Sequence, residues 1–189
     1  MQGVYARVSA QYDWMRRNVC EYSTAPPESF TCEDLASEEW SIIIEEEFTY
    51  GFGVFNEPEN NANHYVTAMN RGGVVRIEGG EEGVSVLKSS QISLAHNPFS
   101  KFKVSFNFYA VEMEHSDNLC LGYEVDGGAI TGEKCWSSLH AFENDRWYDD
   151  MSFEFEASNV SNLRLIFTVK GDDGVDDVLL DAVTIKGQV

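Results

Sequence analysis

Aromatic side chains are the residues of this chain best suited to hold a ligand by direct contact. They make up 13% of the 189 residues, and sugars bind on flat rings that are flanked by hydrogen-bonding groups. Tyr109 is the most suggestive, because it occupies the polar face of a segment that otherwise alternates cleanly. Sandwich cores also contain many aromatic residues, so each candidate has a structural alternative. The predicted ligand-binding residues are Tyr109, Trp136, Trp147 and Tyr148.

Asp181 is the carboxylate whose position demands a partner. In an extended segment it shares a face with Leu179, Val183 and Ile185, and an unpaired carboxylate among apolar neighbours costs on the order of several kcal/mol. Backbone N–H groups of a loop can satisfy it. The acidic loop at 172–177 could also attract a cation, but its spacing does not match the EF-hand pattern, and a solvated turn is the better interpretation.

No set of residues indicates catalysis, so we predict no catalytic residue. The four histidines, His64, His96, His115 and His140, are scattered, and no Gly-x-Ser-x-Gly motif accompanies them. The glycines around residues 71–73 and 79–80 lack the Lys-Ser/Thr of a phosphate loop. A triad assembled from distant residues, or a pair of carboxylates for glycoside hydrolysis, stays open in so acidic a chain.

The cysteines favour an oxidising compartment. If Gly127-Gly128 is a two-residue hairpin loop, Cys120 lies directly opposite Cys135, at a separation that a disulfide can span. Cys20 and Cys32 bracket a proline-containing segment and would close a second, small loop. The alternative is four free thiols in a cytosolic protein. Zinc is disfavoured because no Cys-x-x-Cys pair or histidine stands at ligand spacing.

Alternating segments predict an antiparallel β-sandwich. Residues 102–110, 151–155 and 163–169 alternate apolar and polar side chains, and no helical pattern of similar length competes. Glycine-rich turns are expected at 71–73, 79–80, 126–128 and 171–174. Further strands are expected at 41–48, 74–78, 84–87, 119–125, 133–138 and 177–185. Eight to ten short strands with such turns predict a mainly β fold, a two-sheet sandwich of jelly-roll type.

The start of the chain has a different pattern. Residues 3–8, Gly-Val-Tyr-Ala-Arg-Val, lead through Ser9, a good helix N-cap, into a helix carrying Trp14. This resembles the last strand and C-terminal helix of trypsin-like serine proteases. The resemblance implies that Gly3, Val4 and Tyr5 correspond to a wall of the specificity pocket, and that the catalytic triad lies upstream. We therefore divide the chain into a protease remnant (1–23), a linker (24–39) and an accessory domain (40–189).

The accessory domain resembles a second group of proteins. The stretch 52–56, the strand 103–110, the hairpin at 126–128 and the ending 176–185 are similar to jelly-roll carbohydrate-binding modules and to MAM-like adhesive domains. That resemblance implies a structural Ca²⁺ held by Asp181 and an acidic residue near the first strand, with Glu47 the candidate beside Glu45 and Glu46. The chain departs from the pattern at Phe48-Thr49, where such modules have Phe-Glu.

The net charge of the chain limits the classes of molecule that it could bind. The formal net charge is −19, and nearly all the acidic residues follow residue 23, so nucleic acid and anionic membranes are poor partners. No stretch is apolar enough for a membrane span.

The sequence predicts the C-terminal part of a secreted serine endopeptidase. This part is inactive alone, and its sandwich binds glycan or extracellular protein. The alternative is a free-standing extracellular module that binds carbohydrate or mediates adhesion, with or without Ca²⁺. An independent sandwich hydrolase is a third interpretation.

Overall fold

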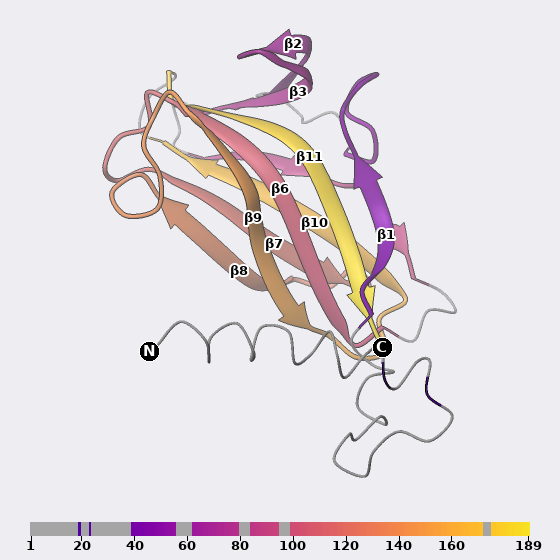
Figure 1. The fold of residues 1–189 in the computed structure, drawn as a ribbon. Helices are drawn as coiled ribbons and strands as arrows, with labels where there is room; N and C mark the ends of the chain where they lie inside the picture. The colour runs from indigo at the N-terminus through magenta and orange to yellow at the C-terminus, as the bar shows by residue number, and fades with distance from the viewer. Residues whose placement is uncertain are drawn as a thin grey trace, which may run out of the picture. The chain divides into compact units, whose positions relative to one another are not determined.

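The structure is a computed structural model, and it describes residues 19, 23, 39–55, 62–79, 84–94, 99–171 and 175–189. From residue 39 onward every regular element of the described ranges is a β-strand, and residues Ser41–Gly187 form one compact unit (Figure 1). The strands are β1 (Ser41–Glu46), β2 (Ala62–Ala68), β3 (Arg71–Glu78), β4 (Ser85–Lys88), β5 (Ile92–Ser93), β6 (Lys101–Val111), β7 (Asn118–Val125), β8 (Ile130–Ser137), β9 (Trp147–Glu156), β10 (Asn162–Lys170) and β11 (Asp177–Gln188).

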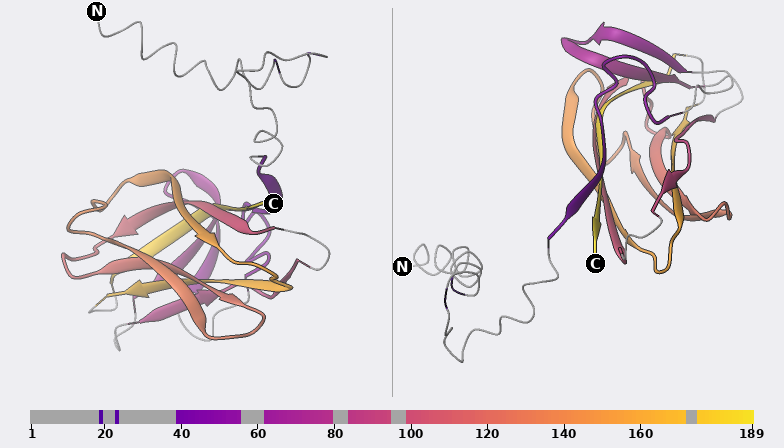
Figure 2. Two further views of the ribbon diagram at one scale, coloured as in Figure 1. Left: turned by 90° about the horizontal axis from the view of Figure 1, so that it is seen from below. Right: turned by 90° about the vertical axis from the view of Figure 1, so that its right-hand side faces the viewer.

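The strands build two antiparallel sheets that face each other (Figure 2). The six-stranded sheet has the order β2-β3-β11-β6-β9, with β1 also paired to β11. The five-stranded sheet has the order β4-β10-β7-β8, with β5 also paired to β10. The fold is the predicted antiparallel jelly-roll β-sandwich. The protease-like strand and helix that we expect before it lie outside the described residues.

Aromatic side chains fill the space between the sheets. Phe106 on β6 meets Phe167 on β10 with ring centroids 5.1 Å apart, and meets Trp136 on β8 at 5.3 Å, both edge to face. All three rings are at most 6% exposed, and burying a large apolar side chain contributes about 1.5–3 kcal/mol. The alternation predicted for 102–110 is confirmed, since every second side chain of β6 is buried.

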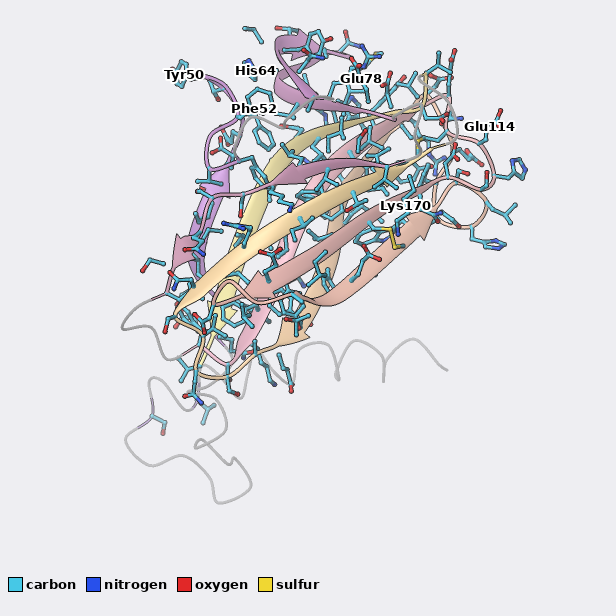
Figure 3. All side chains as sticks on the ribbon, turned by 180° about the vertical axis from the view of Figure 1, so that it is seen from behind. Tyr50, Phe52, His64, Glu78, Glu114 and Lys170 are labelled. Atoms are coloured by element: carbon cyan, nitrogen blue, oxygen red, sulfur yellow. A yellow bond between two sulfur atoms is a disulfide. The ribbon has the colours of Figure 1, made fainter. Side chains whose placement is uncertain are left out.

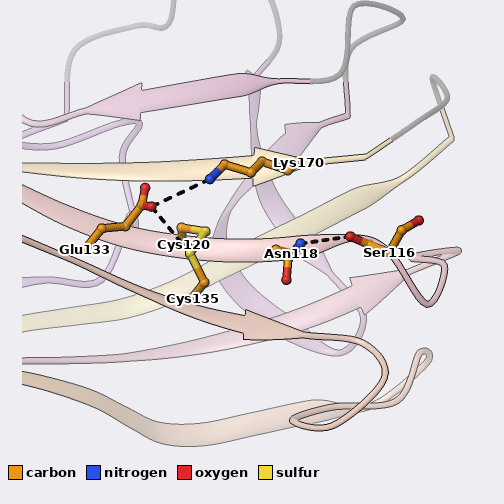
Figure 4. Close-up of a disulfide and its surroundings, with 6 residues drawn as sticks. All are labelled: Ser116, Asn118, Cys120, Glu133, Cys135 and Lys170. Carbon is orange, nitrogen blue, oxygen red and sulfur yellow. Dashed lines mark hydrogen bonds and ion pairs between the residues drawn. A yellow bond between two sulfur atoms is a disulfide. The ribbon is translucent and has the colours of Figure 1, made fainter.

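The β7–β8 hairpin carries the predicted disulfide, although the turn differs from the prediction (Figure 4). Cys120 pairs with Cys135 in the strand register, and the two sulfurs are bonded. The turn is centred on Asp126 and Gly127, both with positive φ, and not on Gly127-Gly128. Between this turn and the disulfide, β8 contains two more residues than β7, and the register shift between Tyr123 and Glu124 accounts for one of them. A β-bulge in the hairpin therefore contributes to placing Cys120 opposite Cys135.

The β2–β3 hairpin is the largest departure from the sequence-based prediction. β2 was not expected, and residues 71–73, expected as a turn, begin strand β3. The turn falls instead at Met69 and Asn70, which both adopt left-handed conformations without glycine. Gly73 serves close packing, because a Cβ there would overlap the carbonyl oxygen of Glu47.

Candidate functional site

A cluster of aromatic and charged side chains lies on the outer face of the six-stranded sheet. Tyr109, on β6, stands directly opposite Trp147, on β9, and their ring centroids are 5.4 Å apart in an edge-to-face arrangement. Both side chains point away from the core and are partly exposed. The structure thus brings together two of the four predicted ligand-binding residues.

A β-bulge in β9 decides which aromatic side chain faces outward. Phe106 pairs with Met151 but Phe108 pairs with Tyr148, so β9 carries one extra residue, and Asp150 there has a φ of 57°. The bulge shifts the alternation by one residue. As a result Tyr148 points into the sandwich, and Trp147 points outward.

Arg71 joins this cluster from β3. Its guanidinium carbon lies 4.1 Å from the centroid of the Trp147 ring, a cation–π contact. One terminal nitrogen donates to Asp149 at 2.6 Å and the other donates to Asp181 at 3.0 Å. Burial disfavours the charged guanidinium, but the hydrogen bonds and charges of Asp149 and Asp181 outweigh it and raise the pKa of Arg71.

Trp147 is held in place at its polar end as well. The indole Nε1–H donates to the backbone carbonyl of Met69 at 3.0 Å, so the tryptophan ties the β2–β3 turn to β9. Because the indole N–H is satisfied and one part of the ring is covered by Arg71, the ring orientation is fixed before any ligand arrives. A fixed aromatic ring loses little rotamer entropy when it binds.

Tyr109 has a carboxylate beside its hydroxyl. Desolvation raises the pKa of Tyr109, and the charge of Asp145 together with a hydrogen bond to Asp145 raises it further. The phenol therefore stays protonated throughout the physiological range. Together the cluster offers flat rings, a guanidinium and several carboxylate acceptors, groups that can bind a molecule rich in both C–H and O–H bonds.

The other two predicted aromatic ligand residues lie in the sandwich. Trp136 is 6% exposed and packs on Phe106, so its burial leaves no face for a ligand. Tyr148 stacks on Phe108 with ring centroids 5.1 Å apart. Its hydroxyl accepts hydrogen bonds from Arg146 Nε at 2.5 Å and from the backbone N–H of Glu143 at 2.6 Å. Both serve packing, the alternative that the sequence left open.

Asp181 has a partner for its carboxylate, as its position demanded. Its side chain, however, lies on the outer face of β11 and not on the core face that was predicted. Val178 and Leu180 belong to the core, and so do Val183 and Ile185. Ala182 has a φ of 50° and shifts the alternation by one residue, as a β-bulge does. The expectation that Asp181 shares a face with Val183 and Ile185 is therefore wrong, because this shift turns it outward to Arg71.

The residues predicted to hold Ca²⁺ do not fit that ion. The Asp181 carboxylate is bonded to a guanidinium, and a second cation beside Arg71 would be repelled. Glu47 is exposed, whereas its neighbour Glu46 accepts hydrogen bonds from the backbone N–H groups of Phe48 at 2.9 Å and Val54 at 3.0 Å. Glu46 thus closes the loop after β1, and its carboxylate is satisfied by the backbone.

One group of potential metal ligands occurs among the described residues, at Cys120, Glu133 and Cys135. Its two sulfurs form the disulfide, and Glu133 lies 3.6 Å from the ammonium of Lys170 (Figure 4). Disulfide sulfur is not a thiolate, so this group is not suited to hold a metal ion.

The loop after β1 carries two further aromatic residues, Tyr50 and Phe52, and Phe52 packs against the core (Figure 3). Tyr50 is fully exposed at its tip. Phe52 lies near the ring of His64 on β2, with centroids 6.4 Å apart, and His64 Nε2 is 2.6 Å from the carbonyl oxygen of Phe48. Phe52 and His64 therefore serve to pack the loop against β2.

Several predictions fall on residues that the structure does not describe. They concern the specificity-pocket remnant Gly3, Val4 and Tyr5, and the disulfide between Cys20 and Cys32. Across the described ranges, no helix has the length and apolar character needed to cross a membrane.

Sequence reasoning missed Arg71, Asp145 and Asp149. Arg71 sits where a turn was expected, and its carboxylate partners come from β9 and β11. No local pattern in the sequence marks such a contact. The only available signal was that Asp181 needed a partner.

Comparison with known proteins gives a fold and no family. No family model matches the chain, and no curated protein matches it. The solved structure of TmCBM61 in complex with β-1,4-galactotriose aligns with a TM-score of 0.51 at 13% identity, covering 74% of this chain and 92% of that one. At this identity the likeness concerns the fold alone, an antiparallel β-sandwich.

Two further structures align less closely. The C-terminal CBM6 of LamC, a laminarinase of Zobellia galactanivorans, has a TM-score of 0.48 and 12% identity, over 75% of this chain and 97% of that chain. The enzymatically active domain of tailspike protein 4 of bacteriophage CBA120 has a TM-score of 0.48 and 7% identity, over 75% of this chain and 20% of that one.

Proposed function

We propose that the sandwich is a glycan-binding module whose binding site is the Tyr109–Trp147 cluster. The observation that carries the proposal is the fixed pair of outward rings on β6 and β9, flanked by Arg71, Asp149 and Asp145. Pyranose rings expose apolar C–H faces and a rim of hydroxyls. Aromatic faces bind the first, and carboxylates and guanidinium groups hydrogen-bond the second.

The fold supports the same proposal. The TmCBM61 structure holds β-1,4-galactotriose, which makes a β-1,4-linked galactan a sensible first probe. The Cys120–Cys135 disulfide is consistent with an extracellular setting, where polysaccharides are encountered. We therefore infer a secreted accessory role for the module.

A glycan array with the purified chain tests the proposal. We expect specific binding that Trp147→Ala and Tyr109→Ala each lower at least tenfold. Tyr50→Ala is the matched control, because Tyr50 is a fully exposed aromatic outside the cluster. Circular dichroism and melting curves confirm that each variant is folded.

The array also separates the competing interpretations. Binding that survives Trp147→Ala and Tyr109→Ala but is lost in Tyr50→Ala would move the site to the loop after β1. An array without any specific binding would count against glycan recognition and favour an extracellular protein partner.

We further propose that the module belonged to a trypsin-like serine endopeptidase. The proposal rests on residues 3–8 and the helical pattern after them, which lie outside the described residues. Genomic sequence upstream of Met1 tests it. A coding segment for Gly-Asp-Ser-Gly-Gly would support the missing protease domain, whereas a signal peptide there would favour the free-standing module.

A further inference from the structure

We propose that the glycan bound on this face is uncharged, and that the face rejects chains bearing carboxylate or sulfate groups. This inference rests on the proposed glycan-binding function. Arginine in a binding site ordinarily indicates an anionic ligand, because the guanidinium fork matches carboxylate and sulfate oxygens. Here the outer face carries two arginines, and both are occupied by carboxylates of the protein.

Arg71 is the first of these arginines. Its two terminal nitrogens donate to two different carboxylates, Asp149 at 2.6 Å and Asp181 at 3.0 Å, while its plane lies over Trp147. A ligand carboxylate would have to displace one of them. The site therefore offers no uncompensated positive charge at Arg71.

Arg76 is the second, and it repeats the arrangement farther along the sheet. It alternates with the core residues Val75 and Ile77, so it faces outward, and it stands opposite Leu179 on β11. Its terminal nitrogens lie 2.6 Å from Asp177 and 3.3 Å from Glu78. The hydrogen bond that Arg76 donates to Asp177 is the largest cause of the raised pKa of Arg76.

Carboxylates exceed arginines in both groups on this face. Arg71 is balanced against Asp149 and Asp181, and Arg76 farther along the sheet is balanced against Asp177 and Glu78. Asp145 adds a further negative charge beside Tyr109. Burial raises the pKa of Asp177 and outweighs the hydrogen bond and charge of Arg76, which lower it. The charges of Glu78 and Asp176 raise this pKa further. A further anion bound beside these carboxylates would be repelled by them. At 0.1 M ionic strength, salt would screen this repulsion only beyond about 10 Å.

Matched ligand pairs test the inference. The probes are β-1,4-galactan, a cello-oligosaccharide and a β-1,3-glucan, each beside its C6-carboxylated and O-sulfated derivative. We expect the charged derivative of any chain that binds to bind at least tenfold more weakly at low salt, with a smaller difference at high salt. A charged derivative that binds as tightly as its neutral parent would overturn the inference and leave glycan binding intact. Failure of every probe would instead count against the proposed function and the inference together.

A pair of variants tests the cause. Asp149→Asn removes one negative charge from Arg71, and Asp149 is exposed enough for the change to be tolerated. Glu124→Gln is the matched control, since it frees Arg164 in the same way on the five-stranded sheet. We expect Asp149→Asn to raise the affinity ratio of carboxylated to neutral chain at least threefold, and Glu124→Gln to leave it unchanged. Equal ratios in both variants would show that local neutralisation of Arg71 is not the cause.

Discussion

Arg71 lies with its guanidinium carbon 4.1 Å from the centre of the Trp147 ring, and this contact joins β3 to β9 across the face of one sheet. The same arginine bonds to Asp149 on β9 and Asp181 on β11. Three strands that are distant in the sequence are thus fastened by a single side chain.

Replacing Arg71 should destabilise the sandwich. Arg71→Met leaves Asp181, whose side chain is 14% exposed, without its partner, so we expect the free energy of unfolding to fall by about 1–3 kcal/mol. Urea unfolding measures it. Lys103→Met is the control, because it breaks a more exposed ion pair with Glu154 and should cost about 0–1 kcal/mol. Equal losses in the two variants would contradict the role assigned to Arg71.

Tyr109 should ionise at higher pH than a free tyrosine. Desolvation and the Asp145 carboxylate both disfavour the phenolate, which raises the pKa of Tyr109. Asp145→Asn removes the negative charge, so the pKa should fall toward its ordinary value of about 10. Ultraviolet titration of tyrosinate measures it, with Tyr109→Phe identifying the transition. Identical curves for the wild type and Asp145→Asn would refute the coupling.

Gly53 should be intolerant of any side chain. Its φ is 55°, and a Cβ there would overlap the carboxylate of Glu46 that closes the loop. We expect Gly53→Ala to lower stability by about 1–3 kcal/mol. In the background of Glu46→Ala the overlap disappears but the backbone strain remains. The cost of Gly53→Ala should therefore shrink without vanishing in a double-mutant cycle.

The disulfide should stabilise the hairpin by a moderate amount. Cys120 and Cys135 are 15 residues apart, and closing a loop of that length is worth about 3 kcal/mol in the chain-entropy model. Cys120→Ala with Cys135→Ala should lower the denaturation midpoint accordingly. Reductant should shift the wild type to the same midpoint and leave the double variant unmoved.

Calcium should not stabilise the protein through Asp181. A ligand that binds only the folded state raises the melting temperature, but the carboxylate of Asp181 is engaged by Arg71. We expect equal midpoints with Ca²⁺ and with chelator. A rise of several degrees in Ca²⁺ that is abolished in Asp181→Asn would restore the metal site that the jelly-roll resemblance implies.

Local patterns in the sequence predicted the strands well. The segment 102–110 shows the reason, because its alternation reflects one buried face and one open face, which residues i and i+2 share. The pairing of Cys120 with Cys135 was also predictable, since it follows from strand geometry near a turn. The pairing is present although the turn position was wrong, because extra residues of β8 near the turn, including the bulge beside Tyr123, restore the register.

The site was predictable only in part, because single inserted residues reverse an alternating pattern. The bulge at Asp150 exchanges the directions of Trp147 and Tyr148, and the left-handed Ala182 turns Asp181 outward. Neither position carries a glycine or proline that would mark it. Arg71 was missed for a different reason, because its partners are set by the order of strands in the sheet.

The hydrogen bond from Trp147 has a consequence for how such a site can change during evolution. The acceptor is the backbone carbonyl of Met69, and the side chains of Met69 and Asn70 are exposed. Substitutions at these two positions would therefore preserve the bond that anchors the hairpin, provided the new residues accept the left-handed backbone. Ligand preference can diversify at the hairpin turn among descendants of this chain, while Trp147 and Arg71 remain constrained by the stability of the sheet.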